Sequence, residues 1–244
     1  MITLPKNCTV LFIGDSITHG GRGATMDLNH IMGHGFQSIV ASSLAYDNCE
    51  REPKFVNKGI SGDTSYGIYA RIESDVIPYR PDIVNLLCGV NDLGKIDLPT
   101  GTVVGRYLDS VEGFVRDIQA ALPEVKIILC EPFYYDVQNQ DAPYEGIPHP
   151  KCEEDFAFHN RVRDEQAIQK RKQNLASMQK GLREIAVRYK TIFVPMQDLF
   201  DEAAKRASAS YFIWDNVHPT MVGHEMMARR WLSVVEQALL QQES

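Results

Sequence analysis

Short apolar runs alternate along the chain with longer segments of helical periodicity. The runs predict strands at 10–13, 55–57, 83–88, 127–130 and 191–194, and several of them are rich in β-branched residues. None of them alternates strictly between apolar and polar positions. Continuous apolar strands are typical of a sheet that is covered on both faces.

Three segments have apolar residues at the spacing of one helix face. They predict amphipathic helices over 107–122, 175–189 and 227–238. We expect Pro219 to lie in the first turn of the last helix, because its fixed φ suits that position. Strands and helices in alternation predict right-handed βαβ units and a three-layer α/β fold with a mostly parallel sheet. Ligands of such sheets bind outside the carboxyl ends of the strands.

The segment from 134 to about 172 departs from this rhythm. It is polar, contains three prolines and ends in charged residues without a clean apolar stripe. We interpret it as an insertion after the fourth strand, followed by an exposed helix start. It can cover a site as a lid or remain a solvated loop. We expect residues 1–244 to form a single domain that includes this insertion.

Composition narrows the function classes. The 244 residues, of which 44% are hydrophobic, are enough for one sizeable core. A net charge of −7 disfavours partners that present phosphates, so we expect no nucleic-acid partner and no anionic membrane surface. No apolar stretch reaches the length of about 20 residues that a membrane span needs.

The five cysteines indicate a reducing compartment. They lie at 8, 49, 88, 130 and 152, form no CxxC motif and are odd in number. The opening "MITLPKNCTV" lacks a basic region followed by a long apolar core, so it does not have the pattern of a signal peptide. We therefore expect a cytoplasmic protein.

The first apolar run ends in the polar, glycine-rich stretch "VLFIGDSITHGG", which places Ser16 just beyond a strand. This serine is either a helix cap or a nucleophile. A nucleophilic serine needs a base, and the base needs a group that fixes its tautomer. The stretch "WDNVHPT" supplies both in one loop, with Asp215 three residues before His218. Such a pair also occurs by chance, so it does not decide the matter alone.

Two other loops after predicted strands offer donors for an oxyanion. "NKGISGDTS" contains Gly62, whose backbone N–H can approach a substrate closely because no Cβ stands in the way, and "CGVND" contains the side-chain amide of Asn91. A glycine turn with a helix cap, and a turn closed by Asn and Asp, are the structural alternatives.

We expect structural roles for the other polar residues near these loops. Asp15, Asp63 and Asp92 are expected to brace loops through backbone hydrogen bonds, and His224 to be a structural partner rather than a second base. His30 and His34 are four residues apart and could share a helix face, but no supporting carboxylate pattern follows, so we expect no metal site. The G-x-S-x-G, GxxxxGK[ST] and HExxH motifs are absent.

The order of "GDSI", "NKGISGDTS", "GVND" and "DNVHP" resembles the four blocks of the GDSL, or SGNH, family of serine esterases and acylhydrolases. The resemblance implies a flavodoxin-like αβα sandwich with a five-stranded, mostly parallel sheet. It maps a Ser-His-Asp triad to the serine, the histidine and the aspartate singled out above. It also implies an oxyanion hole formed by the backbone N–H of the same serine, by Gly62 and by Asn91. Ile17 replaces the usual leucine, and His19 stands where many relatives carry an acidic residue.

Two residues are candidates for substrate binding, Trp214 from the resemblance and Arg22 from its own chemistry, with a solvated loop charge as the alternative for Arg22. Trp214 precedes the triad aspartate as in carbohydrate-directed and short-acyl members, and the guanidinium of Arg22 can fork onto a carboxylate or sugar hydroxyls. We expect a serine esterase of short acyl esters, such as O-acetyl groups on carbohydrates, that needs no metal or organic cofactor. A lysophospholipase or thioesterase acting on longer chains is the alternative, and a non-catalytic carbohydrate-binding module is a third. The sequence leaves the oligomeric state open.

Overall fold

The computed structural model of the chain describes residues 2–25, 27–94, 102–137 and 164–242. Within these residues five parallel strands form one sheet in the order β2-β1-β3-β4-β5. This order is that of flavodoxin-like folds. The strands are β1 (Thr9–Gly14), β2 (Lys54–Gly59), β3 (Ile83–Leu87), β4 (Lys126–Cys130) and β5 (Ile192–Val194). All five predicted strands are confirmed, with ends that differ by at most two residues.

The helices of the described residues lie on both sides of this sheet. They are α1 (Ser16–His19), α2 (Phe36–Asp47), α3 (Ser65–Ala70), α4 (Ile72–Asp75), α5 (Val103–Ala121), α7 (Glu165–Arg188), α8 (Gln197–Ala203) and α9 (Met221–Gln242), with short 3-10 helices at Cys49–Arg51, Ile77–Tyr79, Asp92–Gly94 and Ala209–Tyr211. The three predicted amphipathic helices are confirmed as α5, α7 and α9. Helices α2, α3, α4 and α8 were not predicted from the sequence.

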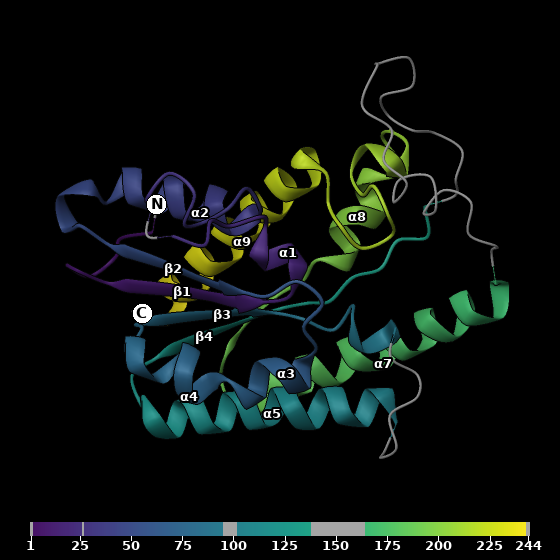
Figure 1. Cartoon of the computed structure of the whole chain (residues 1–244), viewed down its shortest axis with the longest axis horizontal. Coiled ribbons are helices and arrows are strands. Elements are labelled where there is room, and N and C mark those ends of the chain that lie inside the picture. The colour runs from purple at the N-terminus through teal and green to yellow at the C-terminus, as the bar shows by residue number, and fades with distance from the viewer. Residues whose placement is uncertain (1, 26, 95–101, 138–163, 243–244) are drawn as a thin grey trace.

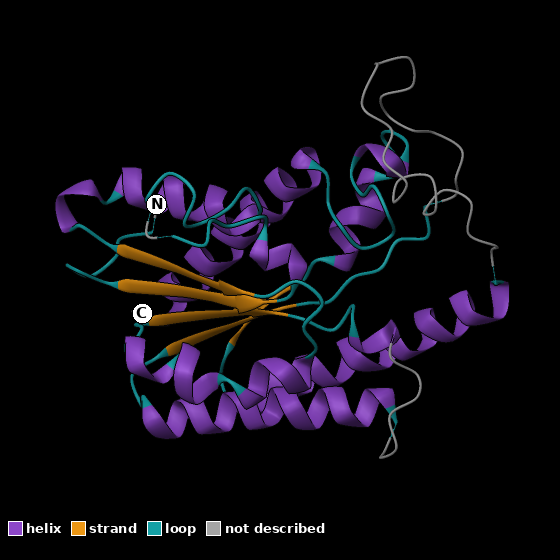
Figure 2. Ribbon diagram, viewed as in Figure 1, coloured by secondary structure: helices purple, strands orange, loops and turns teal. Residues whose placement is uncertain are grey.

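The sheet is the middle layer of three. Helices α2, α8 and α9 cover one face, and α3, α4, α5 and α7 cover the other (Figures 1 and 2). Successive residues of β1 enter opposite cores: Val10 and Phe12 pack with α2 and α9, whereas Leu11 and Ile13 pack with α5 and α7. Burial on both faces explains why the strands are continuously apolar, and the predicted three-layer α/β fold is confirmed.

Helix α9 is anchored to the sheet by one large side chain. Trp231 is fully buried, and its ring centroid lies 6.0 Å from that of Phe12 in β1. Its indole N–H donates to Asn85 Oδ1 in β3 at 2.7 Å, so the polar end of the side chain is also satisfied inside the core. This contact fixes the helix that follows the loop carrying Asp215 and His218.

The prediction for Pro219 is wrong. Helix α9 begins at Met221, and Pro219 instead pairs with Ile213 in an isolated antiparallel bridge. The hydroxyl of Thr220 accepts the N–H of Gly223 at 3.3 Å, which is the contact of a helix N-cap. The threonine therefore sets the start of the helix.

The predicted polar insertion at 134–172 lies largely outside the described residues, which resume at Asp164. The Asp164 carboxylate accepts the N–H groups of Gln166 and Ala167 and caps α7, so the last part of the predicted insertion, from Glu165, is already helical. Residues 138–163 of the insertion lie outside the described residues, so its role as a lid or as a solvated loop is untested.

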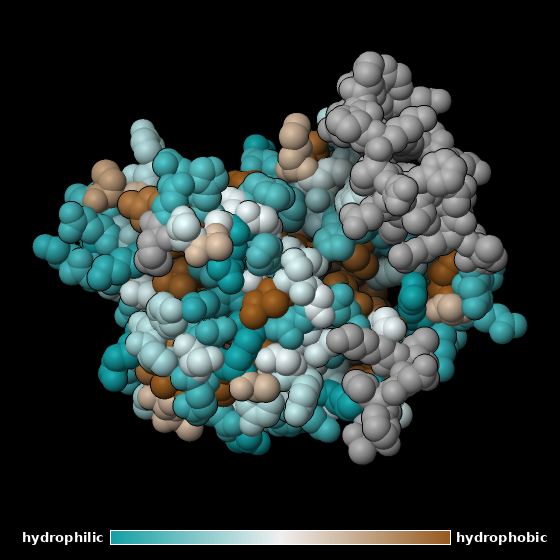
Figure 3. Space-filling model, in the orientation of Figure 1, coloured by the Kyte–Doolittle hydropathy of each residue, from teal (hydrophilic) through white to brown (hydrophobic). Residues whose placement is uncertain are grey.

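The visible surface is mixed, with hydrophobic residues in small separate patches among hydrophilic ones (Figure 3). Among the described residues, no helix combines the length and the apolar character needed to cross a membrane.

Candidate active site

Ser16 lies at the carboxyl end of β1, at the first position of α1. The helix is capped by Asp15, whose Oδ1 accepts the N–H of Ile17 at 3.0 Å, so the serine hydroxyl is not used as a cap. A side chain at Gly14 would collide with the backbone oxygen of Leu87 and with Thr18. The glycine therefore lets α1 turn tightly against β3, which presents Ser16 at the sheet edge.

The structure brings Ser16, His218 and Asp215 into one hydrogen-bonded chain, as predicted. Ser16 Oγ lies 2.7 Å from His218 Nε2, and His218 Nδ1 lies 2.5 Å from Asp215 Oδ2. Because the carboxylate accepts from Nδ1–H, Nε2 of the neutral ring is left to accept the serine proton. This is the arrangement that a general base for a serine nucleophile requires.

The loop that carries His218 closes on itself. Asp215 Oδ1 accepts the backbone N–H groups of Val217 and His218, at 3.2 and 2.7 Å, and the N–H of Trp214 donates to the carbonyl of His218 at 3.0 Å. The three-residue spacing thus lets one carboxylate hold both the ring and the backbone of the histidine.

The hydrogen bond that His218 donates to Asp215 raises the pKa of His218 above its ordinary value, against the opposing effect of burial, and the charges of Asp215 and Asp15 act in the same direction. A raised pKa means that the imidazolium form is stabilised at this position. The imidazolium is the form that exists after the base has taken the serine proton.

Gly62 lies in a tight turn just beyond the carboxyl end of β2. The N–H of Asp63 donates to the carbonyl of Ile60 at 3.2 Å, and Gly62 has φ +80°, a conformation that favours glycine. A Cβ at this position would meet no atom within 4 Å, so the space next to the turn is open. We name residues 60–63 the oxyanion turn. Its first N–H, from Ile60, donates to the carbonyl of Gly14 at 3.0 Å, which links it to the end of β1.

Asn91 reaches the oxyanion turn from the loop after β3. Its Nδ2 donates to the carbonyl of Asp63 at 2.9 Å. A side-chain amide nitrogen carries two N–H groups, and the described residues supply an acceptor for one of them. The structure thus places all the predicted triad and oxyanion residues at the same edge of the sheet.

The aspartates that neighbour these residues brace loops, as predicted. Asp63 Oδ1 accepts the N–H of Thr64 at 3.0 Å, and Asp92 accepts from both the N–H and the hydroxyl of Ser65. Asp15 is fully buried, and burial raises its pKa to about 7 even though the N–H of Ile17 opposes this shift.

The two residues expected to bind substrate differ in exposure. Arg22 is half-buried, and its Nε donates to the carbonyl of Gly59 at 3.2 Å. Trp214, adjacent to Asp215, is 43% exposed. Their role in binding stays a prediction.

Two other histidines of the described residues, His30 and His224, make structural contacts. His30 and His34, which their spacing would allow to share a helix face, do not lie on a helix, and His30 Nδ1 lies 2.6 Å from Asp27 Oδ2. Between residues 2 and 242, outside the undescribed gaps, no group of three or more His, Cys, Asp or Glu side chains could hold a metal ion. His224 Nδ1 accepts the N–H of Phe36 at 3.1 Å, which confirms its structural role, and burial lowers its pKa to about 4.

One residue of this region, Arg71, was not predicted from the sequence. Its guanidinium contacts Asp63 of the oxyanion turn and the carbonyl of Gly14. The only sequence signal is a carboxylate four residues later, Asp75, which indicates a helical ion pair but not a contact with the site.

Comparison with known proteins identifies the family. The model of the GDSL-like lipase/acylhydrolase family matches residues 12–226. The chain belongs to this family. It is therefore a carboxylic ester hydrolase, and its flavodoxin-like fold is that of solved GDSL structures.

Three relatives illustrate the similarity of this GDSL hydrolase to known proteins. An acetylxylan esterase of Geobacillus stearothermophilus is 32% identical over 228 residues, 91% of each chain. A crystal structure from Parabacteroides merdae, described as a GDSL-like lipase, is 30% identical with a TM-score of 0.78 and covers 96% of this chain and 97% of its own. The crystal structure of Axe2, an acetylxylan esterase of G. stearothermophilus, is 29% identical with a TM-score of 0.73, over 96% of each chain.

Proposed function

We propose that this hydrolase removes short acyl groups, with O-acetyl groups on carbohydrates as its substrates, through a covalent acyl-enzyme on Ser16. The single observation that carries the proposal is the hydrogen-bonded chain from Ser16 through His218 to Asp215. The similarity to two proteins described as acetylxylan esterases supports the acetyl group and the carbohydrate. Two Axe2 variants, one with a serine and one with an aspartate replaced by alanine, are described as catalytic mutants, which agrees with the proposed roles of Ser16 and Asp215.

The first half of the reaction forms the acyl-enzyme. Ser16 Oγ attacks the acyl carbon while His218 Nε2 takes its proton, and Asp215 stabilises the imidazolium. The carbonyl oxygen becomes an oxyanion that accepts hydrogen bonds from the backbone N–H groups of Ser16 and Gly62 and from Asn91 Nδ2. When the intermediate collapses, the bond to the alcohol oxygen breaks, and His218 gives its proton to that leaving oxygen.

The second half releases the acyl group. His218 takes a proton from water, the hydroxide attacks the acyl carbon through the same oxyanion site, and the bond to Ser16 Oγ breaks as the proton returns to the serine. The products are a carboxylic acid and the free alcohol. The proposed steps use side chains and backbone groups alone, and no metal or organic cofactor takes part.

Arg22 and Trp214 are proposed to bind the alcohol part of the substrate. The partly exposed indole of Trp214 beside Asp215 offers a face on which a sugar ring can stack, and Arg22 Nη1 and Nη2 extend beyond the anchored Nε. Arg22→Ala should therefore raise KM for an acetylated oligosaccharide more than KM for p-nitrophenyl acetate. Equal effects on both substrates would show that the residue does not contact the sugar.

We also propose that the chain forms one domain. We treat residues 1–244 as one domain, since the family model spans 12–226 and both ends of the described chain pack on the same sheet.

The proposed function is tested with Ser16→Ala, an ester series and acetylated xylo-oligosaccharides. The variant should fold like the wild type and lose nearly all activity, and a fluorophosphonate should label the wild-type protein at Ser16. Ser177→Ala, on an exposed face of α7 with its hydroxyl bonded to the carbonyl of Gln173, is the matched control and should retain both activity and label.

Among p-nitrophenyl esters, acetate should be hydrolysed faster than octanoate or palmitate. A preference for the longer chains would favour a lysophospholipase or thioesterase over the proposed esterase. Binding of oligosaccharide without any hydrolysis would indicate a non-catalytic carbohydrate-binding module.

A further inference from the structure

Within the described part of the chain, two hydrogen bonds join the backbone of the oxyanion turn, residues 60–63, to other segments. Its first N–H donates to the carbonyl of Gly14, and its last carbonyl, from Asp63, accepts from Asn91. Gly62 itself has open space beside it. Because the turn is short and partly exposed, its position depends on what holds the side chain of Asp63.

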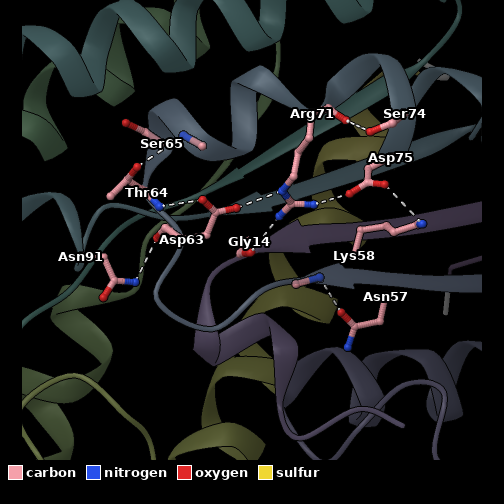
Figure 4. A network of polar contacts seen from close by, with 12 residues as sticks. Gly14, Asn57, Lys58, Asp63, Thr64, Ser65, Arg71, Ser74, Asp75 and Asn91 are labelled. Atoms are coloured by element: carbon pink, nitrogen blue, oxygen red, sulfur yellow. Dashed lines mark hydrogen bonds and ion pairs between the residues drawn. The ribbon is translucent and has the colours of Figure 1, made fainter. Parts of the chain in front are cut away.

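That side chain is held by Arg71, from the end of α3. Figure 4 shows the guanidinium between Asp63, Gly14 and Asp75. Nε donates to Asp63 Oδ2 at 2.9 Å, Nη2 donates to the carbonyl of Gly14 at 3.3 Å, and Nη1 donates to Asp75 Oδ2 at 2.7 Å. One planar group thus contacts the oxyanion turn and, two residues before Ser16, the end of β1.

The network is shielded and balanced in charge. The side chains of Arg71 and Asp63 are each 14% exposed. Asp75 also lies 3.4 Å from Lys58 Nζ, so two positive and two negative groups meet here. Ion pairs with little solvent around them are screened less than those on the surface. Removing the guanidinium would leave the carboxylate of Asp63 without its charged partner and free the turn to move.

We propose that Arg71 is a positioning residue that sets the distance between the Gly62 N–H and Ser16 Oγ. The inference rests on the proposed roles of Ser16 and Gly62. Arginine suits this task because its three nitrogens bind three partners in one plane, whereas a lysine ammonium cannot span them. Oxyanion donors act only when they lie at hydrogen-bond distance from the developing charge, and a shift of about 1 Å can cost about 100-fold in rate.

The kinetic test compares Arg71→Gln and Arg71→Lys with the wild type. Both should lower kcat for p-nitrophenyl acetate by about 10- to 100-fold, with KM within about twofold, because the loss falls on the transition state. The inhibition constant of a boronic acid, which forms a tetrahedral adduct on the serine, should rise by a similar factor. A merely stabilising arginine would lower Tm and leave kcat per folded molecule unchanged.

Arg230→Lys is the matched control. Arg230 also binds a carboxylate and a backbone carbonyl, those of Asp198 and Pro195, and is 24% exposed, but it touches neither the triad nor the oxyanion turn. This variant should keep the wild-type kcat and boronate inhibition.

Hydrogen exchange gives a readout that does not depend on turnover. The N–H groups of Ile60, Asp63 and Thr64 are hydrogen-bonded within the turn or to β1, so they should exchange faster in Arg71→Gln and not in Arg230→Lys. Unchanged exchange, or unchanged kcat in both Arg71 variants, would overturn the proposal. If instead Ser16→Ala kept full esterase activity, the proposed function would fail, while the exchange would still decide whether Arg71 holds the turn.

Discussion

The residues around Ser16 are held in two different ways. Asp215 and His218 come from one loop whose carboxylate binds its own backbone, so their mutual geometry is set locally. Asn91 and Gly62 come from separate loops after β3 and β2 and meet only because those strands flank β1. The geometry of the Asp215–His218 pair is therefore less sensitive to distant changes than that of Gly62 and Asn91, whereas the contact of His218 with Ser16 depends on tertiary structure.

Asn91→Ala should lower kcat by about 10²- to 10³-fold, or about 2.7 to 4 kcal/mol, with little change in KM. The reason is that the amide meets charge only in the transition state. Asn91→Asp should be at least as harmful, since a carboxylate would meet the oxyanion as a like charge. Steady-state kinetics and thermal unfolding of both variants check this. A stable Asn91→Ala enzyme with near-normal kcat would limit this residue to its bond with Asp63.

The pH profile of the wild-type enzyme should report His218. A general base must be neutral, so kcat/KM should fall as pH drops through a pKa above the ordinary value of 6.5, which Asp215 raises. Asp215→Asn removes the charge that raises the pKa, and the acidic limb of the profile should then move to lower pH, while kcat falls at every pH. A limb that stays in place in this variant would show that another group controls it.

At the scale of elements, loops at the carboxyl ends of β1, β2 and β3 and the loop before α9 supply the candidate site. The loop before α9 is held in place by that helix. Trp231 of α9 is bonded to Asn85 in the core, and His224 of α9 accepts the N–H of Phe36 at the start of α2. The bond between His224 and Phe36 joins α9 to α2, two helices that cover the same face of the sheet (Figure 1).

His224→Leu should therefore reduce stability and not catalysis. It keeps a side chain of similar size but leaves the buried N–H of Phe36 unsatisfied, which costs about 1 to 3 kcal/mol. Urea unfolding measures the loss, and kcat per folded molecule should stay near the wild-type value. Gln237→Ala, at an exposed position of the same helix, should change neither. A large loss of kcat in His224→Leu would assign the histidine to the reaction.

The elements that the sequence predicted are those with strong local signals. Apolar runs located all five strands, and long apolar stripes located α5, α7 and α9. Helices α3, α4 and α8 are at most seven residues long, so a stripe has too few positions to be recognised. Pro219 was misplaced because the Thr220 cap sets the start of α9.

The residues of the candidate site also divide into those with a local sequence signal and those without one. Motif spacing located Ser16, Asp215 and His218, and the position of Gly62 and Asn91 in loops after predicted parallel strands implied that they would lie at the same edge of the sheet. Arg71 was not predicted, since its contact with Gly14 joins residues 57 positions apart and depends on how α3 packs against β1. Such contacts are decided by tertiary structure and leave no local pattern.

At the scale of the whole molecule, two buried ionisable groups, His224 and Asp15, make the stability of the fold depend on pH, and their effects have opposite signs. The pKa of His224 is lowered to about 4, so its contribution is present above pH 6.5 and is lost as pH falls toward 4. The pKa of Asp15 is raised to about 7, so the fold loses stability as pH rises from about 4 to 7, because over this range the carboxyl ionises in the unfolded chain but stays protonated in the core.

Asp15→Asn separates the two effects. Asparagine keeps the oxygen that accepts the N–H of Ile17 and places a neutral group where Asp15 Oδ2 has no hydrogen-bond partner among the described residues. The variant should gain stability over the wild type as pH rises, by on the order of a few kcal/mol between pH 5 and pH 8. Urea unfolding at both pH values measures this gain, and Asp47→Asn, at an exposed position, controls for the loss of one negative charge. A gain that is the same at both pH values would show that Asp15 does not titrate inside the fold.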